Sequence, residues 1–108
     1  MNESLTVVIE RNADFASEFL TEPYETAWAR EACWFLVLDE QPDPGVTITV
    51  TTEISPDGLN WCAQDRALTL PAGERVTSWA NRDFGGWLRI RGVVGGSVRG
   101  SLYLALKA

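Results

Sequence analysis

The sequence predicts an all-β protein: an antiparallel β-sandwich, jelly-roll-like, with about eight strands. Two observations carry this prediction. Apolar and polar residues alternate with a period of two along most of the chain, as in strands that bury one face and expose the other. Turn-forming residues separate these stretches about every ten residues, at Pro23, 42–45, 56–58, 71–73, 85–86 and 95–96. The 108 residues match the usual size of one domain, so we expect a single sandwich over 1–108.

Three stretches show the alternation with a clear buried face. In 46–54, valines and isoleucines share one face, while threonines and Glu53 share the other. The stretches 5–9 and 101–107 also carry an apolar residue at every second position. The intervening segment 15–20 (FASEFL) fits either a short helical turn or an edge segment of the sheet.

A fourth strand is expected over 87–94. Leu88 and Ile90 point inward there, and Arg89 and Arg91 point outward. The glycines that follow this stretch, and those that precede it, are read as hairpin turns or points of close strand approach. They have no following helix and no lysine in place, so they do not form a phosphate-binding loop.

The stretch 33–38 (CWFLVL) is apolar at every position. It is either a central strand covered on both sides or a strand whose outer face contacts another chain. A helix over 26–38 is the rival interpretation, because periodicity does not separate the two for short apolar runs. A strand is favoured, since 39–45 (DEQPDPG) then forms a hairpin loop to the next strand.

Composition excludes several functions. The net charge of -6 disfavours nucleic acid and anionic membranes as partners, because both require clustered cations. The chain has no His, which removes the commonest general base and metal ligand. A glycosidase-type carboxylate pair among Glu22, Glu25 and Glu31 is the alternative, but 108 residues leave little room for a substrate cleft, so we expect no enzyme, no cofactor and no metal. The acidic loop with Asp39, Glu40 and Asp43 is expected to be solvated, with a Ca²⁺ site as the alternative. Cys33 and Cys62 are expected to be small buried side chains, and the sequence leaves open whether they pair.

The segment 55–61 (SPDGLNW) is the most clearly patterned turn. Pro56 fixes φ, Asp57 hydrogen-bonds its own backbone, and Gly58 accepts a positive φ. Trp61 follows where the return strand begins. We expect this Trp to anchor the hairpin, with a ligand-binding platform as the alternative.

This turn carries a resemblance to known proteins. Ser-x-Asp-Gly-x-x-Trp after an alternating strand is similar to the turn of discoidin-type domains, although their usual terminal Cys pair is absent here. A larger part of the chain, about 35–108, resembles small phage structural proteins. The shared features are the alternating strand, the 55–61 turn, the Leu-Pro-Ala-Gly turn at 70–73, the Phe-Gly-Gly-x-x-Arg-x-Arg stretch at 84–91 and the glycine-rich segment before the last strand.

The phage resemblance implies a non-enzymatic virion component, such as a capsid decoration or head-tail protein, that self-associates or docks on a larger particle. It also suggests a homo-oligomer, with a trimer as the specific expectation. The N-terminus has no basic region followed by an apolar run, so we expect synthesis in the cytoplasm without a signal peptide and association with a virion or particle. The alternative function is a carbohydrate-binding module that uses exposed Trp residues.

Two groups of side chains are the candidate interface to a partner or ligand. Tryptophans near expected strand ends or loops form the first group, because Trp is enriched at binding hot spots. Outward-facing arginines form the second, because Arg suits docking on an acidic surface, with a salt-bridged sheet face as the alternative. The candidate residues are Trp28, Trp79, Trp87, Arg89, Arg91 and Arg99.

Overall fold

The structure is a computed structural model that describes residues 3–108. These residues form antiparallel strands and no helix. The strands are β1 (Ser4–Leu20), β2 (Tyr24–Glu25), β3 (Glu31–Leu38), β4 (Thr47–Ser55), β5 (Cys62–Ala63), β6 (Leu68–Thr69), β7 (Val76–Arg82) and β8 (Trp87–Lys107). The predicted all-β class is confirmed, and the helix considered over 26–38 is wrong. Residues 1 and 2 of the domain expected over 1–108 lie outside the described part.

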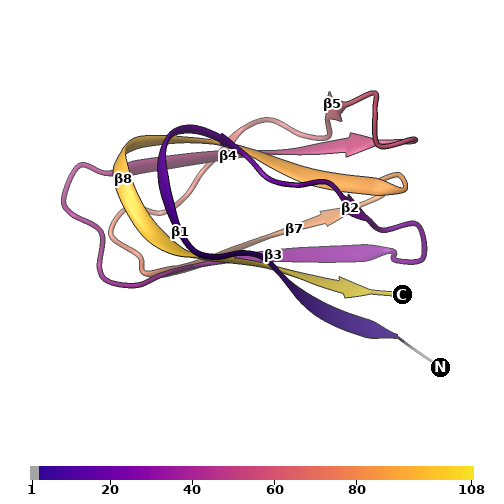
Figure 1. The fold of residues 1–108 in the computed structure, drawn as a ribbon, viewed down its shortest axis with the longest axis horizontal. Helices are drawn as coiled ribbons and strands as arrows, with labels where there is room; N and C mark the ends of the chain where they lie inside the picture. The colour runs from indigo at the N-terminus through magenta and orange to yellow at the C-terminus, as the bar shows by residue number, and fades with distance from the viewer. Residues whose placement is uncertain (1–2) are drawn as a thin grey trace.

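The strands form one sheet that curls into a half-barrel, as expected for a sandwich-like fold. The curl follows β8, whose first part pairs with β4 and whose second part pairs with β3. Strand β1 runs along the opposite edge of β8 through the same bend. Figure 1 shows β1 and β8 turning together on the left, from the upper half of the molecule to the lower half.

Two facing halves result, and we name them after their central strands. The β4 half contains β4, the first part of β8 and the last part of β1, with the short strands β2, β5 and β6 at its margins. The β3 half contains, in order, β7, β3, the second part of β8 and the first part of β1. Figure 1 shows β4 above β3 in this view.

The core consists of the inward residues of both halves, as the alternation predicted. The buried apolar side chains of the β3 half include Trp34, Leu36, Leu38, Leu102, Leu104 and Leu106, and those of the β4 half include Ile48, Val50, Leu88, Ile90 and Val94. In β1, Val7 and Ile9 pack against this core, whereas Leu5 is 43% exposed. The segment 15–20 is strand, and Phe15 lies in the core.

One polar bridge crosses the core. Asn81 on β7 accepts hydrogen bonds through Oδ1 from Trp34 Nε1 on β3 and from Thr52 Oγ1 on β4, each at 3.0 Å. The indole is a donor only, so the amide oxygen must face it. The bridge therefore ties the β3 half to the β4 half. Beside it, the rings of Trp34 and Trp79 are stacked with centroids 6.4 Å apart.

The hairpin expected over 39–45 is wrong, and for the glycines at 85–86 and 95–96 close strand approach is found in place of a hairpin turn. A Cβ at Gly85 would lie 3.0 Å from the Ser55 carbonyl oxygen, and a Cβ at Gly95 would lie 2.5 Å from Thr47 Oγ1. The loop 39–45 joins β3 to β4, and 85–86 lies between β7 and β8, but neither pair of strands is adjacent in the sheet. The glycines at 95–96 lie inside the continuous strand β8, where Gly96 has a φ of +104° next to the bend. Turn residues mark a change of direction, and they do not specify whether the chain returns beside the same strand or crosses to the other half.

Candidate interaction surface

The outer face of the β3 half is apolar. Residues at every second position of β3 point away from the core, and their cross-strand partners on the neighbouring strands share that face. The apolar residues on it are Val8, Cys33, Phe35, Val37, Val76, Ala80, Tyr103 and Ala105. We call this set the apolar outer face.

No segment of residues 3–108 forms a layer over the apolar outer face. At its two sides, Val8 on β1 is 37% exposed and Val76 on β7 is 47% exposed. Phe35, Val37 and Tyr103, on the strands between β1 and β7, are half-buried. Four strands at about 4.8 Å spacing give this patch a projected area of about 300 Å². The largest apolar patch of a typical monomer covers about 300–600 Å² and is often functional, so this face is a candidate interaction site. Of the two readings of 33–38, the structure shows a central strand that is covered on one side only.

The outer face of the β4 half is more mixed in chemistry. It presents Thr47, Thr49 and Thr51 from β4 beside Glu53 and the arginines of β8. It also exposes two apolar side chains, Val93 at 46% and Leu20 at 50%, which are set among these polar and charged residues. The apolar residues are therefore grouped on the outer face of the β3 half and interspersed with polar ones on that of the β4 half.

Two of the candidate arginines belong to an internal ion-pair group. Arg89 Nε lies 2.7 Å from Glu53 Oε1, and Arg91 Nε lies 3.4 Å from Glu53 Oε2. The Arg89 guanidinium also lies 4.1 Å from the ring centroid of Trp61. The Arg89 side chain is only 16% exposed, so its charge is directed toward the protein and leaves Arg91 as the more accessible of the two.

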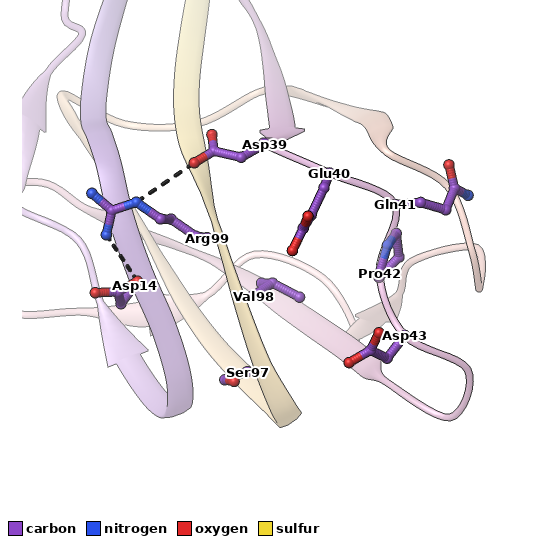
Figure 2. A pocket seen from close by; sticks show the side chains of 9 residues that line it. All are labelled: Asp14, Asp39, Glu40, Gln41, Pro42, Asp43, Ser97, Val98 and Arg99. Carbon is purple, nitrogen blue, oxygen red and sulfur yellow. Dashed lines mark hydrogen bonds and ion pairs between the residues drawn. The ribbon is translucent and has the colours of Figure 1, made fainter.

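Arg99 lies apart from this group, in the bend region. It contacts Asp14 Oδ1 at 2.9 Å and Asp39 Oδ2 at 3.5 Å, and Figure 2 shows the guanidinium between the two carboxylates. The structure thus brings Arg89 and Arg91 together through Glu53 but does not add Arg99 to them. A docking role for any of the three remains a prediction.

The three candidate tryptophans have different environments. Trp28 lies in the loop before β3, is 36% exposed, and borders a shallow depression with Leu5. Trp79 lies in the middle of β7 rather than near a strand end, and it is 9% exposed in the core. Trp87 is half-buried, and its ring lies 3.2 Å from the position a Cβ would take at Gly58. Their binding roles remain predictions, with Trp28 the best placed for contact with solvent.

The 55–61 turn is closed by its own side chains. Ser55 Oγ accepts the backbone N–H of Gly58 at 2.8 Å, and Gly58 has a φ of +78°. The Asp57 carboxylate accepts the backbone N–H groups of Asn60 and Leu59, both at 2.8 Å, and these bonds hold the pKa of Asp57 well below its usual range. These contacts are those of a structural turn.

The strand pairing across this turn confirms the expected hairpin. Ile54 lies opposite Cys62, so β5 returns beside β4 directly after the turn. Trp61 precedes β5, where its ring supports Arg89 rather than the core. A ligand role for Trp61 remains a prediction.

The acidic loop after β3 lines an open depression, drawn in Figure 2. Asp39 is engaged by Arg99, while Glu40 and Asp43 lie further along the loop. Among residues 3–108, no group of three or more Cys, Asp or Glu side chains is placed to hold a metal ion. The Ca²⁺ alternative is therefore left without a ligand set.

Cys33 and Cys62 are both free thiols. Cys33 is half-buried on the apolar outer face, and Cys62 is exposed on β5, so neither is the fully buried side chain that the sequence suggested. Across the described residues, no helix is long and apolar enough to cross a membrane.

Sequence comparisons add nothing to this geometry: no protein-family model matches the chain, and no curated protein matches it. Solved structures do match. The chain superimposes on the PBSX exported protein XepA with a TM-score of 0.69 and 15% identity, covering 94% of this chain and 36% of XepA. It superimposes on the VP2 subviral particle of infectious bursal disease virus with a TM-score of 0.64 and 15% identity, covering 98% of this chain and 32% of that one.

A third match spans nearly the full length of both proteins. The SPBc2 prophage-derived protein YomS gives a TM-score of 0.62 at 11% identity, over 100% of this chain and 96% of YomS. The chain therefore has a phage-type structural β fold, and the fold implied by the resemblance is confirmed. It spans about a third of XepA and of VP2 but nearly all of YomS.

Proposed function

We propose that this protein is a non-enzymatic structural component of a phage-type particle, and that it docks on another protein of the particle through the apolar outer face. The observation that carries the proposal is that face itself. No segment of residues 3–108 covers it, and its apolar residues come from four strands, with Thr6, Ser78 and Ser101 as the uncharged polar residues between them. The finer roles of capsid decoration or head-tail protein belong to the same proposal.

Burial of the apolar outer face supplies a physical reason for docking. Apolar surface removed from water contributes about 25 cal/mol per Å², so covering a patch of about 300 Å² contributes several kcal/mol before the cost of association. The patch is smaller than a complete stable interface, which buries about 800 Å² on each partner. It therefore fits the central part of an interface whose rim is polar.

Charges at one end of the patch supply part of such a rim. Glu31 pairs with Arg82 at 2.8 Å there, and both side chains are solvent-exposed. Lys107 lies opposite Glu31 on β8, in the same cross-strand row. An uncharged centre with a charged margin is the usual composition of a protein–protein interface.

The structural comparisons support the class of protein. XepA and YomS are phage-derived proteins, and the VP2 match is a viral particle. A further match, with a TM-score of 0.55, is to Bacillus endospore appendages that form disulfide-linked pili. These are assembly or phage proteins rather than enzymes, and by analogy they favour a structural role and association with a virion.

A direct test is cosedimentation with particles. Lysates of source cells induced for particle production are fractionated by density, and an antibody against the chain locates it. The proposal expects the chain in the particle fraction and in immunogold label on the particles. A chain found only in the soluble fraction, with particles present, would contradict the proposal.

The matched variants are Val37→Lys and Thr51→Lys. Both add one lysine at an outward position within a strand, the first on the apolar outer face and the second on the outer face of the β4 half. Val37→Lys is expected to reduce the particle-bound fraction by at least about tenfold, and Thr51→Lys to leave it unchanged. Equal retention of both variants would exclude the apolar outer face as the docking surface.

A further inference from the structure

The free edge of β7 is the feature that leads beyond the docking proposal. β7 ends the β3 half and pairs with β3 alone. Leu38 N donates to Arg75 O at 2.8 Å, and the register from Val37–Val76 to Glu31–Arg82 is regular. Hydrogen bonding alternates in an antiparallel ladder, so residues 77, 79 and 81 bond toward β3, while 76, 78 and 80 direct their N–H and C=O groups outward.

The outward N–H and C=O groups of Val76, Ser78 and Ala80 have no hydrogen-bond partner among residues 3–108. Among residues 3–108, no loop or side-chain hydrogen bond reaches the backbone of Val76, Ser78 or Ala80, and only the Arg82 carbonyl, further along, accepts one, from Gln64 Nε2. Between Val76 and Asn81 the strand has no charge, no Pro and no bulge. Natural edge strands are usually blocked by one of these devices, because an open edge pairs with other chains.

The other edges of the sheet are covered, interrupted or shorter. β4 is covered by β5 and β6. The free edge of β1 has a regular, uncharged run at Ser4–Val8, and after Val8 it is interrupted by three register shifts and by positive φ at Asn12 and Ser17. Among residues 3–108, the longest regular and uncharged run of free edge is therefore that of β7.

We infer that β7 pairs antiparallel with β7 of a second copy of this chain, about a two-fold axis at Ser78. This register uses all three open residues, with Ser78 opposite itself and Val76 opposite Ala80 of the second copy. It also brings Glu74, which precedes β7, opposite Arg82 of the second copy at each end. Opposite charges thus meet at both ends of the paired strands. The pairing does not depend on the docking role of the apolar outer face.

An unpartnered donor in the core fits the same register. Trp79 Nε1 is buried and donates to no atom of residues 3–108. In the two-fold pairing, Thr77 of the second copy lies opposite Trp79 at a non-hydrogen-bonded position, where side chains are closest. Its hydroxyl offers an acceptor at the edge where the Trp34–Trp79 stack ends.

The pair has a consequence for the rest of the surface. A two-fold axis perpendicular to the sheet keeps both apolar outer faces on the same side. The dimer therefore presents the two apolar outer faces side by side, joined at a seam that carries Ser78 of both copies, and their combined area is closer to that of a stable interface.

Solution mass tests the inference, measured by light scattering over roughly a hundredfold range of concentration, since short interfaces are weak. Wild-type chain is expected to shift from 11.9 kDa to twice that mass. Ser78→Pro removes an outward N–H without removing a bond to β3, so it is expected to keep the monomer's thermal stability and raise the dimer Kd by about thirtyfold. Ser78→Lys is expected to act similarly, by placing like charges opposite each other.

The matched control is Ser97→Lys, which adds the same charge at an exposed position in the bend. It is expected to dimerise as the wild type does. A wild type that stays monomeric throughout would overturn the inference, and so would dimers unaffected by both Ser78 variants. Loss of the dimer in Val37→Lys but not in Ser78→Lys would instead place the contact on the apolar outer face, whose docking role is tested separately by the particle fractions.

Discussion

Replacing Asn81 by Leu tests the polar bridge that joins the two halves of the sheet. The change keeps a side chain of similar size, so the cavity contribution is small, but it removes the acceptor of Trp34 Nε1 and Thr52 Oγ1. Trp34 is fully buried and Thr52 is 6% exposed, so water does not reach either donor freely. Each buried donor left without a partner costs about 1–3 kcal/mol.

The expected loss for Asn81→Leu is therefore about 2–5 kcal/mol of unfolding free energy, a large share of the roughly 5–15 kcal/mol of a typical domain. For a chain of this size, the midpoint of thermal unfolding should fall by roughly 10–25 °C. Urea titration followed by Trp fluorescence gives the free energy, and calorimetry gives the midpoint. A well-folded variant that loses less than about 0.5 kcal/mol would refute the reasoning.

Coupling to Thr52 separates the bridge from general core disruption. Thr52→Val removes one donor and leaves the Trp34 bond intact, so it should cost about 1 kcal/mol. Adding Thr52→Val to Asn81→Leu should recover about 1 kcal/mol, because one orphaned donor then disappears. Strict additivity of the two changes would show that Asn81 does not act through Thr52.

Three further predictions follow from individual contacts. Glu53→Gln leaves the partly buried Arg89 without its carboxylate partner, so it should lower the free energy of unfolding in urea by about 1–3 kcal/mol. Glu31→Gln, at an exposed ion pair, should lower it by less than about 1 kcal/mol. Gly100→Ala places a Cβ 2.3 Å from the Val37 carbonyl oxygen and should destabilise by more than about 2 kcal/mol, whereas Gly86→Ala meets only ordinary contacts near 3.9 Å and should be tolerated. Asp57→Asn should lower the unfolding midpoint at neutral pH, because the folded-state pKa of Asp57 is depressed. The stabilisation by the carboxylate is fully present above its unfolded pKa of 3.8, and it is lost as the pH falls toward the folded-state pKa. The difference in unfolding midpoint between the two proteins should therefore shrink in acid.

The sequence predicted those features of the fold that depend on local pattern. Alternation identified the buried faces of β4 and of both parts of β8, because the pleat places every second side chain on the same face. The 55–61 turn was predicted in detail, since its bonds form within seven residues. The full length of β8 was missed, because Gly95 and Gly96 are typical turn residues but lie in a bend within the strand. The full length of β1 was missed because its stretches 5–9 and 15–20 were interpreted separately.

The candidate site was predicted less well, for a physical reason. The apolar outer face contains one to three residues from each of four strands, and Val8 and Tyr103 come together only through the register of β1 with β8. Only the run 33–38 gave a local signal, and it suggested a contacting outer face as one of two readings. The free edge of β7 had no signal at all, because an edge is defined by which strand is missing beside it.

The most direct test of the account is the distribution of the chain between particle and soluble fractions, compared for wild type, Val37→Lys and Thr51→Lys. The account predicts that wild type and Thr51→Lys sediment with the particles and that Val37→Lys stays in solution as a folded protein. Sedimentation of all three with the particles would contradict docking through the apolar outer face. Absence of the wild type from the particles would contradict the structural role itself.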